Sequence, residues 1–160
     1  MCNLVGLGEG RTPAGDDYLV GYFAALWACS DASRGFAAVL GPRLVALATR
    51  TEHLSGLYLE AAAAGEVSQL IAGVAACIAA GSDDATIGRA VAAALAVGHS
   101  SGAAALLGLL QGCAACAELP GASCVDVVST ADFPAYPQPL FRRKRRVSEA
   151  RSRNLVYDQG

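Results

Sequence analysis

Small side chains dominate this chain, since 34 alanines and 18 glycines make up 52 of its 160 residues. Alanine is the strongest helix former. Strands favour β-branched and aromatic residues, and aromatic residues reach only 6% here. A strict glycine period, which collagen requires, is absent. We therefore predict an all-α fold in which small side chains let the helices pack closely.

Polar start signals and glycine stop signals recur along the chain and divide its body into about six helices. The expected helices cover 16–30, 33–48, 51–64, 66–80, 82–98 and 100–118. A break or kink is expected in the second helix at Gly41-Pro42. A short strand is expected at 125–128. The pattern predicts a compact helical bundle behind a glycine-rich N-terminal loop.

The C-terminal part has a different composition from the body. Seven of the 12 basic residues lie in 142–160, whereas the chain up to Phe141 carries 5 basic and 12 acidic residues. The net charge of −2 therefore averages an acidic body and a basic tail. We expect a helical domain at 1–132 and a disordered, proline-containing tail at 133–160. The chain shows no aromatic platform and no known nucleic-acid motif, so nucleic-acid binding is not expected.

The six cysteines bear on the cellular compartment. The first ten residues, MCNLVGLGEG, do not resemble a signal peptide. We therefore expect reduced, mostly buried thiols in a cytoplasmic protein. Cys113 and Cys116 form a CxxC pair within a helix, without the second pair that a structural zinc site uses, and are interpreted as core thiols. The uncharged stretch 90–117 is interrupted by the polar segment 98–102, so no membrane span is expected.

The first candidate site is the segment GLGEGRTPAGDD at 6–17. Closely spaced glycines let the backbone approach a ligand, and free N–H groups at a helix start attract anions. The segment is neither a dinucleotide fingerprint nor a P-loop, because no strand precedes it and the Gly-Lys-Ser/Thr ending is missing. Asp16 and Asp17 point to different faces, so one could cap the helix while the other reaches a ligand or a divalent cation. The alternative is an ordinary loop with an acidic N-cap.

The second candidate site is Gly98-His99-Ser100-Ser101-Gly102. Two hydroxyls, an imidazole and free N–H groups at a helix start suit a phosphate or a carboxylate. His99 could donate a hydrogen bond or move a proton near neutral pH. The alternative is a tight turn between two helices with a serine cap. A Ser–His hydrolase is not expected, because no strand and no nucleophile elbow precede the serines.

Taken together, the two motifs resemble the AllH-type family of oxamate carbamoyltransferase subunits. Residues 6–21, GLGEGRTPAGDDYLVG, are similar to its G-L-G-x-G-L-T-P-S-G-D-D-[FY]-L-x-G signature, and 98–112 are similar to its G-H-[ST]-S-G-x-D-x-L-x-G segment. Thr51 to Ser68 resembles its middle segment, and the resemblance covers roughly 3–118. The chain departs from the pattern at three positions, Arg11, Ala14 and Ala104. The N-terminal half of the family has no counterpart, so the chain resembles a truncated C-terminal domain.

The resemblance implies a role in purine (allantoin) catabolism. It implies a subunit that acts with partners to exchange a carbamoyl group between oxamate and phosphate. The expected partners are other carbamoyltransferase subunits or further copies of the chain, and the expected ligand is a small anion. A divalent cation at Asp16 or Asp17 is the one cofactor considered. The alternative is a non-catalytic structural or regulatory module in which the motifs make subunit contacts.

We expect the residues of the two motifs to converge in one pocket. The predicted catalytic residues are Asp16, Asp17 and His99, and the predicted ligand-binding residues are Gly8, Gly10, Thr12, Gly15, Ser100, Ser101 and Gly102.

Overall fold

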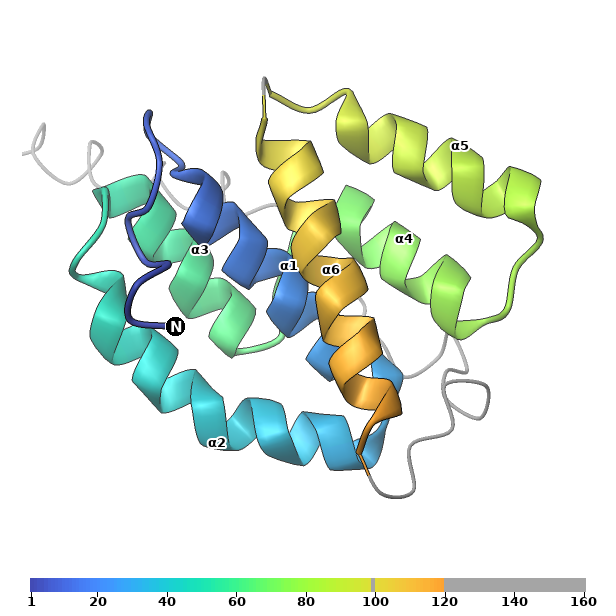
Figure 1. The fold of residues 1–160 in the computed structure, drawn as a ribbon, viewed down its shortest axis with the longest axis horizontal. Coiled ribbons are helices and arrows are strands. Elements are labelled where there is room, and N and C mark those ends of the chain that lie inside the picture. Colours follow the sequence, from blue (N-terminus) through green and yellow to red (C-terminus); the bar gives the residue numbers. More distant parts are fainter. Residues whose placement is uncertain (99, 120–160) are drawn as a thin grey trace, which may run out of the picture.

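The computed structural model describes residues 1–98 and 100–119, which form six α-helices and no strand (Figure 1). The helices are α1 (Ala14–Cys29), α2 (Asp31–Ala48), α3 (His53–Ala63), α4 (Gln69–Ala79), α5 (Asp84–Leu95) and α6 (Ser101–Ala117). The predicted all-α bundle is confirmed. The strand expected at 125–128, the domain end at 132 and the tail at 133–160 lie outside the described residues.

Helix α1 is the centre of the bundle, because it contacts α2, α3, α4 and α6. Helix α5 packs against α4 and α6 at the edge (Figure 1). Phe23 and Leu26 of α1 are fully buried. The other large side chains buried to a similar degree come from four different helices and are Leu44, Leu59, Val74 and Leu109. Burial of apolar surface around α1 therefore holds these helices in one core.

Glycines let α1 and α6 approach until their backbones touch. A Cβ at Gly21 of α1 would overlap the carbonyl oxygen of Ala105, and one at Gly108 of α6 would overlap that of Tyr18. At Gly112 a Cβ would lie 2.6 Å from the Cβ of Ala25. The residues at the start of both helices lie together, as Thr12 and Ser101 do, and so do those near their ends, Ala25 and Cys116, so α1 and α6 run parallel (Figure 1). The loops that precede the two helices therefore lie at the same end of the bundle.

The acidic cap expected at the start of α1 is wrong. Neither Asp16 nor Asp17 caps α1, because the helix begins two residues earlier and its N-cap is Pro13, which makes no side-chain cap. Both aspartates lie in the first turn, where the helix dipole favours negative charge. Of the break or kink expected at Gly41-Pro42, a break is absent, since α2 continues through Pro42. Pro42 and Ala38 are exposed, so water can reach the carbonyl that loses its partner N–H.

The uncharged stretch 90–117 is divided between the second half of α5 and the whole of α6. Among the described residues, no helix combines the length and the apolar character needed to cross a membrane.

Candidate functional site

The carboxylate of Asp16 holds the glycine-rich loop in place. Its side chain is only 1% exposed. Oδ1 accepts a hydrogen bond from the Gly6 N–H at 2.8 Å, and Oδ2 accepts one from the Thr51 hydroxyl at 2.5 Å and one from the Ser55 hydroxyl at 2.7 Å. The three donors come from the N-terminal loop, the α2–α3 connection and α3. Asp16 therefore ties these three segments to α1.

Glycines shape the loop in two distinct ways. Gly6, Gly8 and Gly10 have φ values of 75°, 124° and 91°, in the region that favours glycine. Gly15 is buried, and a Cβ on it would overlap the carbonyl oxygen of Leu4. The predicted ligand-binding residues Gly8 and Gly10 are exposed. Gly15, predicted in the same group, is packed beneath the loop backbone.

A groove of about 490 Å³ lies between the glycine-rich loop and the start of α3. The loop contributes Gly6, Gly8, Gly10 and Pro13, and the α2–α3 connection contributes Thr49, Arg50, Thr51 and Glu52. Arg50 brings a positive charge to this groove, and the positive end of the α3 dipole lies beside it. The Glu52 carboxylate is a negative group in the same wall. We call this feature the glycine-loop groove.

The two sequence motifs meet where the N-terminal loop reaches the start of α6. The Thr12 and Ser101 hydroxyl oxygens are 3.0 Å apart and share a hydrogen bond. The Asp17 side chain lies beside both hydroxyls. The parallel course of α1 and α6 brings these residues together. The structure thus places three of the predicted site residues in one cluster.

The second motif also contains a packing glycine. Gly102 is buried, and a Cβ on it would overlap the carbonyl oxygen of Ala94 in α5. Ser100 is exposed and makes no side-chain cap on α6, so the expected serine cap is not formed by this residue. His99, predicted as catalytic, lies outside the described residues.

The three helices that begin around the loop lack side-chain caps. The N-cap residues of α1, α3 and α6 are Pro13, Glu52 and Ser100, and none of them accepts a hydrogen bond from its helix. In contrast, α2, α4 and α5 are capped by the side chains of Ser30, Ser68 and Asp83. First-turn N–H groups without a capping side chain can bind water or an anionic ligand.

Asp17 sits in an environment that favours its neutral form. Burial raises its pKa above the ordinary value, and the hydroxyls of Ser101 and Thr12 offset only part of this effect. Its Oδ2 atom is buried and has no hydrogen-bond partner among the described residues. Within the described part of the chain, Asp17 therefore has one carboxylate oxygen that accepts no hydrogen bond. Both oxygens of Asp16, in contrast, accept hydrogen bonds from other groups of the chain.

We expect the contribution of Asp17 to stability to fall with rising pH. A carboxyl whose pKa is raised by folding binds its proton more tightly in the folded chain. That stabilisation is complete below the unfolded pKa and is lost as pH rises through the folded pKa. Unfolding midpoints of the wild type and of Asp17→Asn should be measured from about pH 3 to pH 7. We expect the stability of the wild type relative to Asp17→Asn to fall as pH rises over this range.

Asp83→Asn provides a control of opposite sign. The hydrogen bond from the Thr86 hydroxyl lowers the pKa of Asp83, so the stabilisation by this exposed carboxylate is lost as pH falls. The stability of the wild type relative to Asp83→Asn should therefore increase as pH rises. If the stability of the wild type relative to Asp17→Asn also increased with pH, this result would contradict the assigned environment of Asp17.

A metal site of three or more His, Cys, Asp or Glu side chains does not occur in the described part of the chain. Both oxygens of Asp16 already accept hydrogen bonds from protein groups. The divalent cation considered at Asp16 or Asp17 stays a prediction.

Fold and site together define an all-helical domain organised around a glycine-rich loop. The family model described as "Oxamate carbamoyltransferase subunit AllH" matches residues 4–113. This match spans more than half of the chain, so the chain belongs to this family. It covers both motifs and nearly the whole range on which the sequence resemblance rests. Comparison with curated proteins and with solved structures gave no match.

Proposed function

We propose that this chain is the part of an oxamate carbamoyltransferase that binds a small anion in the glycine-loop groove. The observation that carries the proposal is the arrangement around Asp16. Its hydrogen bonds to Gly6, Thr51 and Ser55 fold the loop against the start of α3. Exposed glycine backbone and Arg50 thereby line one groove. The anion would be the carboxylate of oxamate or the phosphate that accepts the carbamoyl group.

The chemistry of carbamoyl transfer agrees with this arrangement. The transferring carbonyl develops negative charge, which positioned N–H groups and cations stabilise. The Arg50 guanidinium can donate two charge-assisted hydrogen bonds, in a bidentate arrangement, to a carboxylate or phosphate. Asp17, in the neighbouring cluster with Thr12 and Ser101 and not in the groove wall, is our candidate for proton exchange, because burial favours its protonated form. We keep His99, Ser100 and Ser101 in the proposed site through their place in the second motif.

Removing the Arg50 guanidinium should weaken binding of the anion. We expect Arg50→Gln to raise the Kd for oxamate or inorganic phosphate roughly tenfold or more, since hydrogen bonds to charged groups contribute about 1.5–3 kcal/mol. Isothermal titration calorimetry measures this directly. Arg43→Gln is the matched control, because Arg43 is an exposed arginine of α2 that does not line the groove. Equal affinities for the two variants would contradict the proposed binding mode.

The second candidate is a non-catalytic subunit module. The hydrogen bonds of Asp16 favour this second candidate. All of their donors belong to the same chain, so the carboxylate orders the loop and does not contact a ligand. Coexpression with partner carbamoyltransferase subunits separates the two proposals. Carbamoyl transfer that survives Asp17→Asn and His99→Ala would favour the module, whereas its loss in folded variants would favour a catalytic contribution. A cytoplasmic location and a role in purine catabolism belong to the same proposal.

A further inference from the structure

Three cysteines meet at the end of the bundle opposite the candidate site. Cys29 is the last residue of α1, and Cys113 and Cys116 lie in the last two turns of α6. The parallel course of these helices and the close contact of Gly112 with Ala25 bring the three thiols together. All three are free. The proposed carbamoyl chemistry uses none of them.

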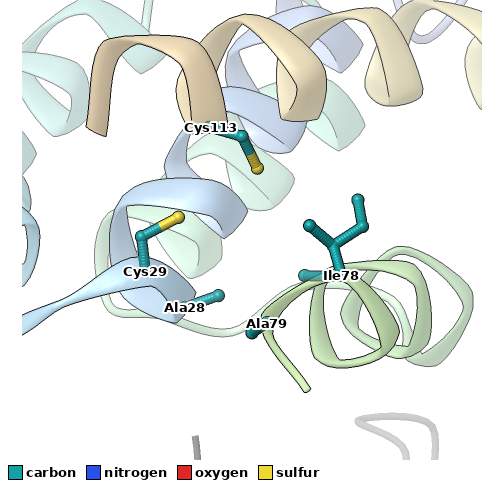
Figure 2. Close-up of a pocket in the computed structure, with 6 residues that line it drawn as sticks. Ala28, Cys29, Ile78, Ala79 and Cys113 are labelled. Atoms are coloured by element: carbon teal, nitrogen blue, oxygen red, sulfur yellow. The ribbon is translucent and has the colours of Figure 1, made fainter. Parts of the chain in front are cut away.

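Cys29 and Cys113 share a small cavity of about 30 Å³, whose other walls come from Ala28, Ala75, Ile78 and Ala79. Figure 2 shows both sulfur atoms pointing into the space between α1, α6 and α4. A single water needs roughly 10–15 Å³ of such volume. By its volume the cavity can therefore hold a molecule of about this size beside the two sulfurs, although its walls are almost entirely apolar.

We propose that Cys29 and Cys113 form a reversible disulfide when the protein meets a hydroperoxide. The Cys113 thiolate attacks one peroxide oxygen, the O–O bond breaks, and the departing oxygen takes up a proton to leave as an alcohol or water. The product is a sulfenic acid on Cys113. The Cys29 sulfur then attacks the Cys113 sulfur, giving up its own proton, and the hydroxyl leaves as water. The two thiols are oxidised and the peroxide is reduced.

The electrostatic surroundings agree with these roles. The hydrogen bond from the Cys29 thiol lowers the pKa of Cys113, and the same contact raises the pKa of Cys29. Cys113 is thus the more readily ionised member of the pair, and the thiolate is the nucleophilic form. Cys29 keeps its proton until the second step and is placed as the resolving thiol.

Burial distinguishes Cys113 from Cys116, although the neighbouring Cys29 thiol also lowers the pKa of Cys116, to about 7. Cys116 is fully buried, does not line the cavity, and its Sγ lies 3.9 Å from the carbonyl oxygen of Ala25. Cys113 is only half-buried and faces the cavity. A peroxide therefore reaches Cys113 more easily than Cys116.

The test uses the full chain carrying Cys2→Ser, Cys77→Ser and Cys124→Ser, so that only the three clustered thiols remain. Hydrogen peroxide is added to the folded protein, unreacted thiols are blocked, and the peptides are mapped by mass spectrometry without reduction. We expect a peptide that joins Cys29 to Cys113 and disappears on treatment with dithiothreitol. Helical circular dichroism should be retained after oxidation. Cys116→Ser in the same background should leave the crosslink intact.

Cys113→Ser should abolish the crosslink in a protein that remains helical. Cys29→Ser serves as a second variant, because its hydroxyl keeps a donor beside Cys113 but cannot form a disulfide, and it should trap a sulfenic acid on Cys113 that a dimedone probe detects. A link between Cys29 and Cys116, or no crosslink in the folded protein, would overturn the proposal. Neither result depends on the proposed anion-binding function, so the two proposals can fail independently.

Discussion

Replacing Gly108 with alanine should destabilise the domain more than any surface substitution. Its Cβ would overlap the carbonyl oxygen of Tyr18, which is backbone and cannot rotate away. Helices α1 and α6 would have to separate along the crossing that also contains Gly21 and Gly112. Overpacking of this kind costs about 1–3 kcal/mol and sometimes more. We expect a loss of about 3 kcal/mol or greater, measured by urea unfolding followed by circular dichroism.

Gly35→Ala and Gly88→Ala are the matched controls. Both glycines lie within exposed helix segments, and a Cβ on either would have no neighbour within 4 Å. Alanine is the better helix former, so each control should stabilise the protein by roughly 0.5–1 kcal/mol. The same substitution should thus have opposite signs at Gly108 and at these two positions. A Gly108→Ala protein as stable as the controls would contradict the close helix crossing.

Replacing Asp16 with alanine should have the second large effect. The change removes the acceptor for the Gly6 N–H and for the hydroxyls of Thr51 and Ser55. Donors left unpaired in a buried site cost about 1–3 kcal/mol each, and both hydroxyls can partly rotate towards other acceptors. We therefore expect a loss of roughly 3 kcal/mol in urea unfolding. Amide hydrogen exchange should also increase in the N-terminal loop.

Asp84→Ala is the control for Asp16→Ala, because both residues are first-turn aspartates but Asp84 is exposed. Its loss should change stability by no more than about 0.5 kcal/mol. If Asp16→Ala were equally mild, or if exchange in the loop were unchanged, Asp16 would not be the residue that holds the loop.

The fold was predictable because alanine content and helix stop signals act locally. Gly65 and Gly81 end their helices with φ values of 86° and 60°, as expected for glycines that follow a helix. The helix crossing was harder to predict, because Gly21 and Gly108 lie within helices, where local rules only mark them as unfavourable. Their role depends on which helices become neighbours, and spacing within one helix does not reveal this.

The candidate site was predictable in part. The meeting of Thr12, Asp17 and Ser101 was expected from the pairing of the two motifs and is found in the structure. The acceptor role of Asp16 was not expected, because its partners Thr51 and Ser55 lie more than 30 residues away in the chain. The resemblance of Thr51 to Ser68 to the middle segment of the family was the available signal for them.

Arg50 was missed for a different reason. It stands alone among neutral and acidic neighbours, and it becomes part of the glycine-loop groove only when Asp16 fixes the loop against the start of α3. Gly15 and Gly102 were placed with the ligand-binding glycines, but both are buried against backbone carbonyl groups. A glycine that permits close packing and one that faces a ligand look the same in a sequence.

Binding of a small anion in the glycine-loop groove, as proposed, can be tested without a partner subunit. The most direct test is a titration of the ¹⁵N-labelled protein with oxamate, followed through the backbone amide signals. We predict saturable shifts confined to the groove, strongest at Gly8, Gly10 and Arg50, and absent from the amides of α4. Shifts spread evenly over the surface, or no saturable shift at the groove amides, would contradict the account.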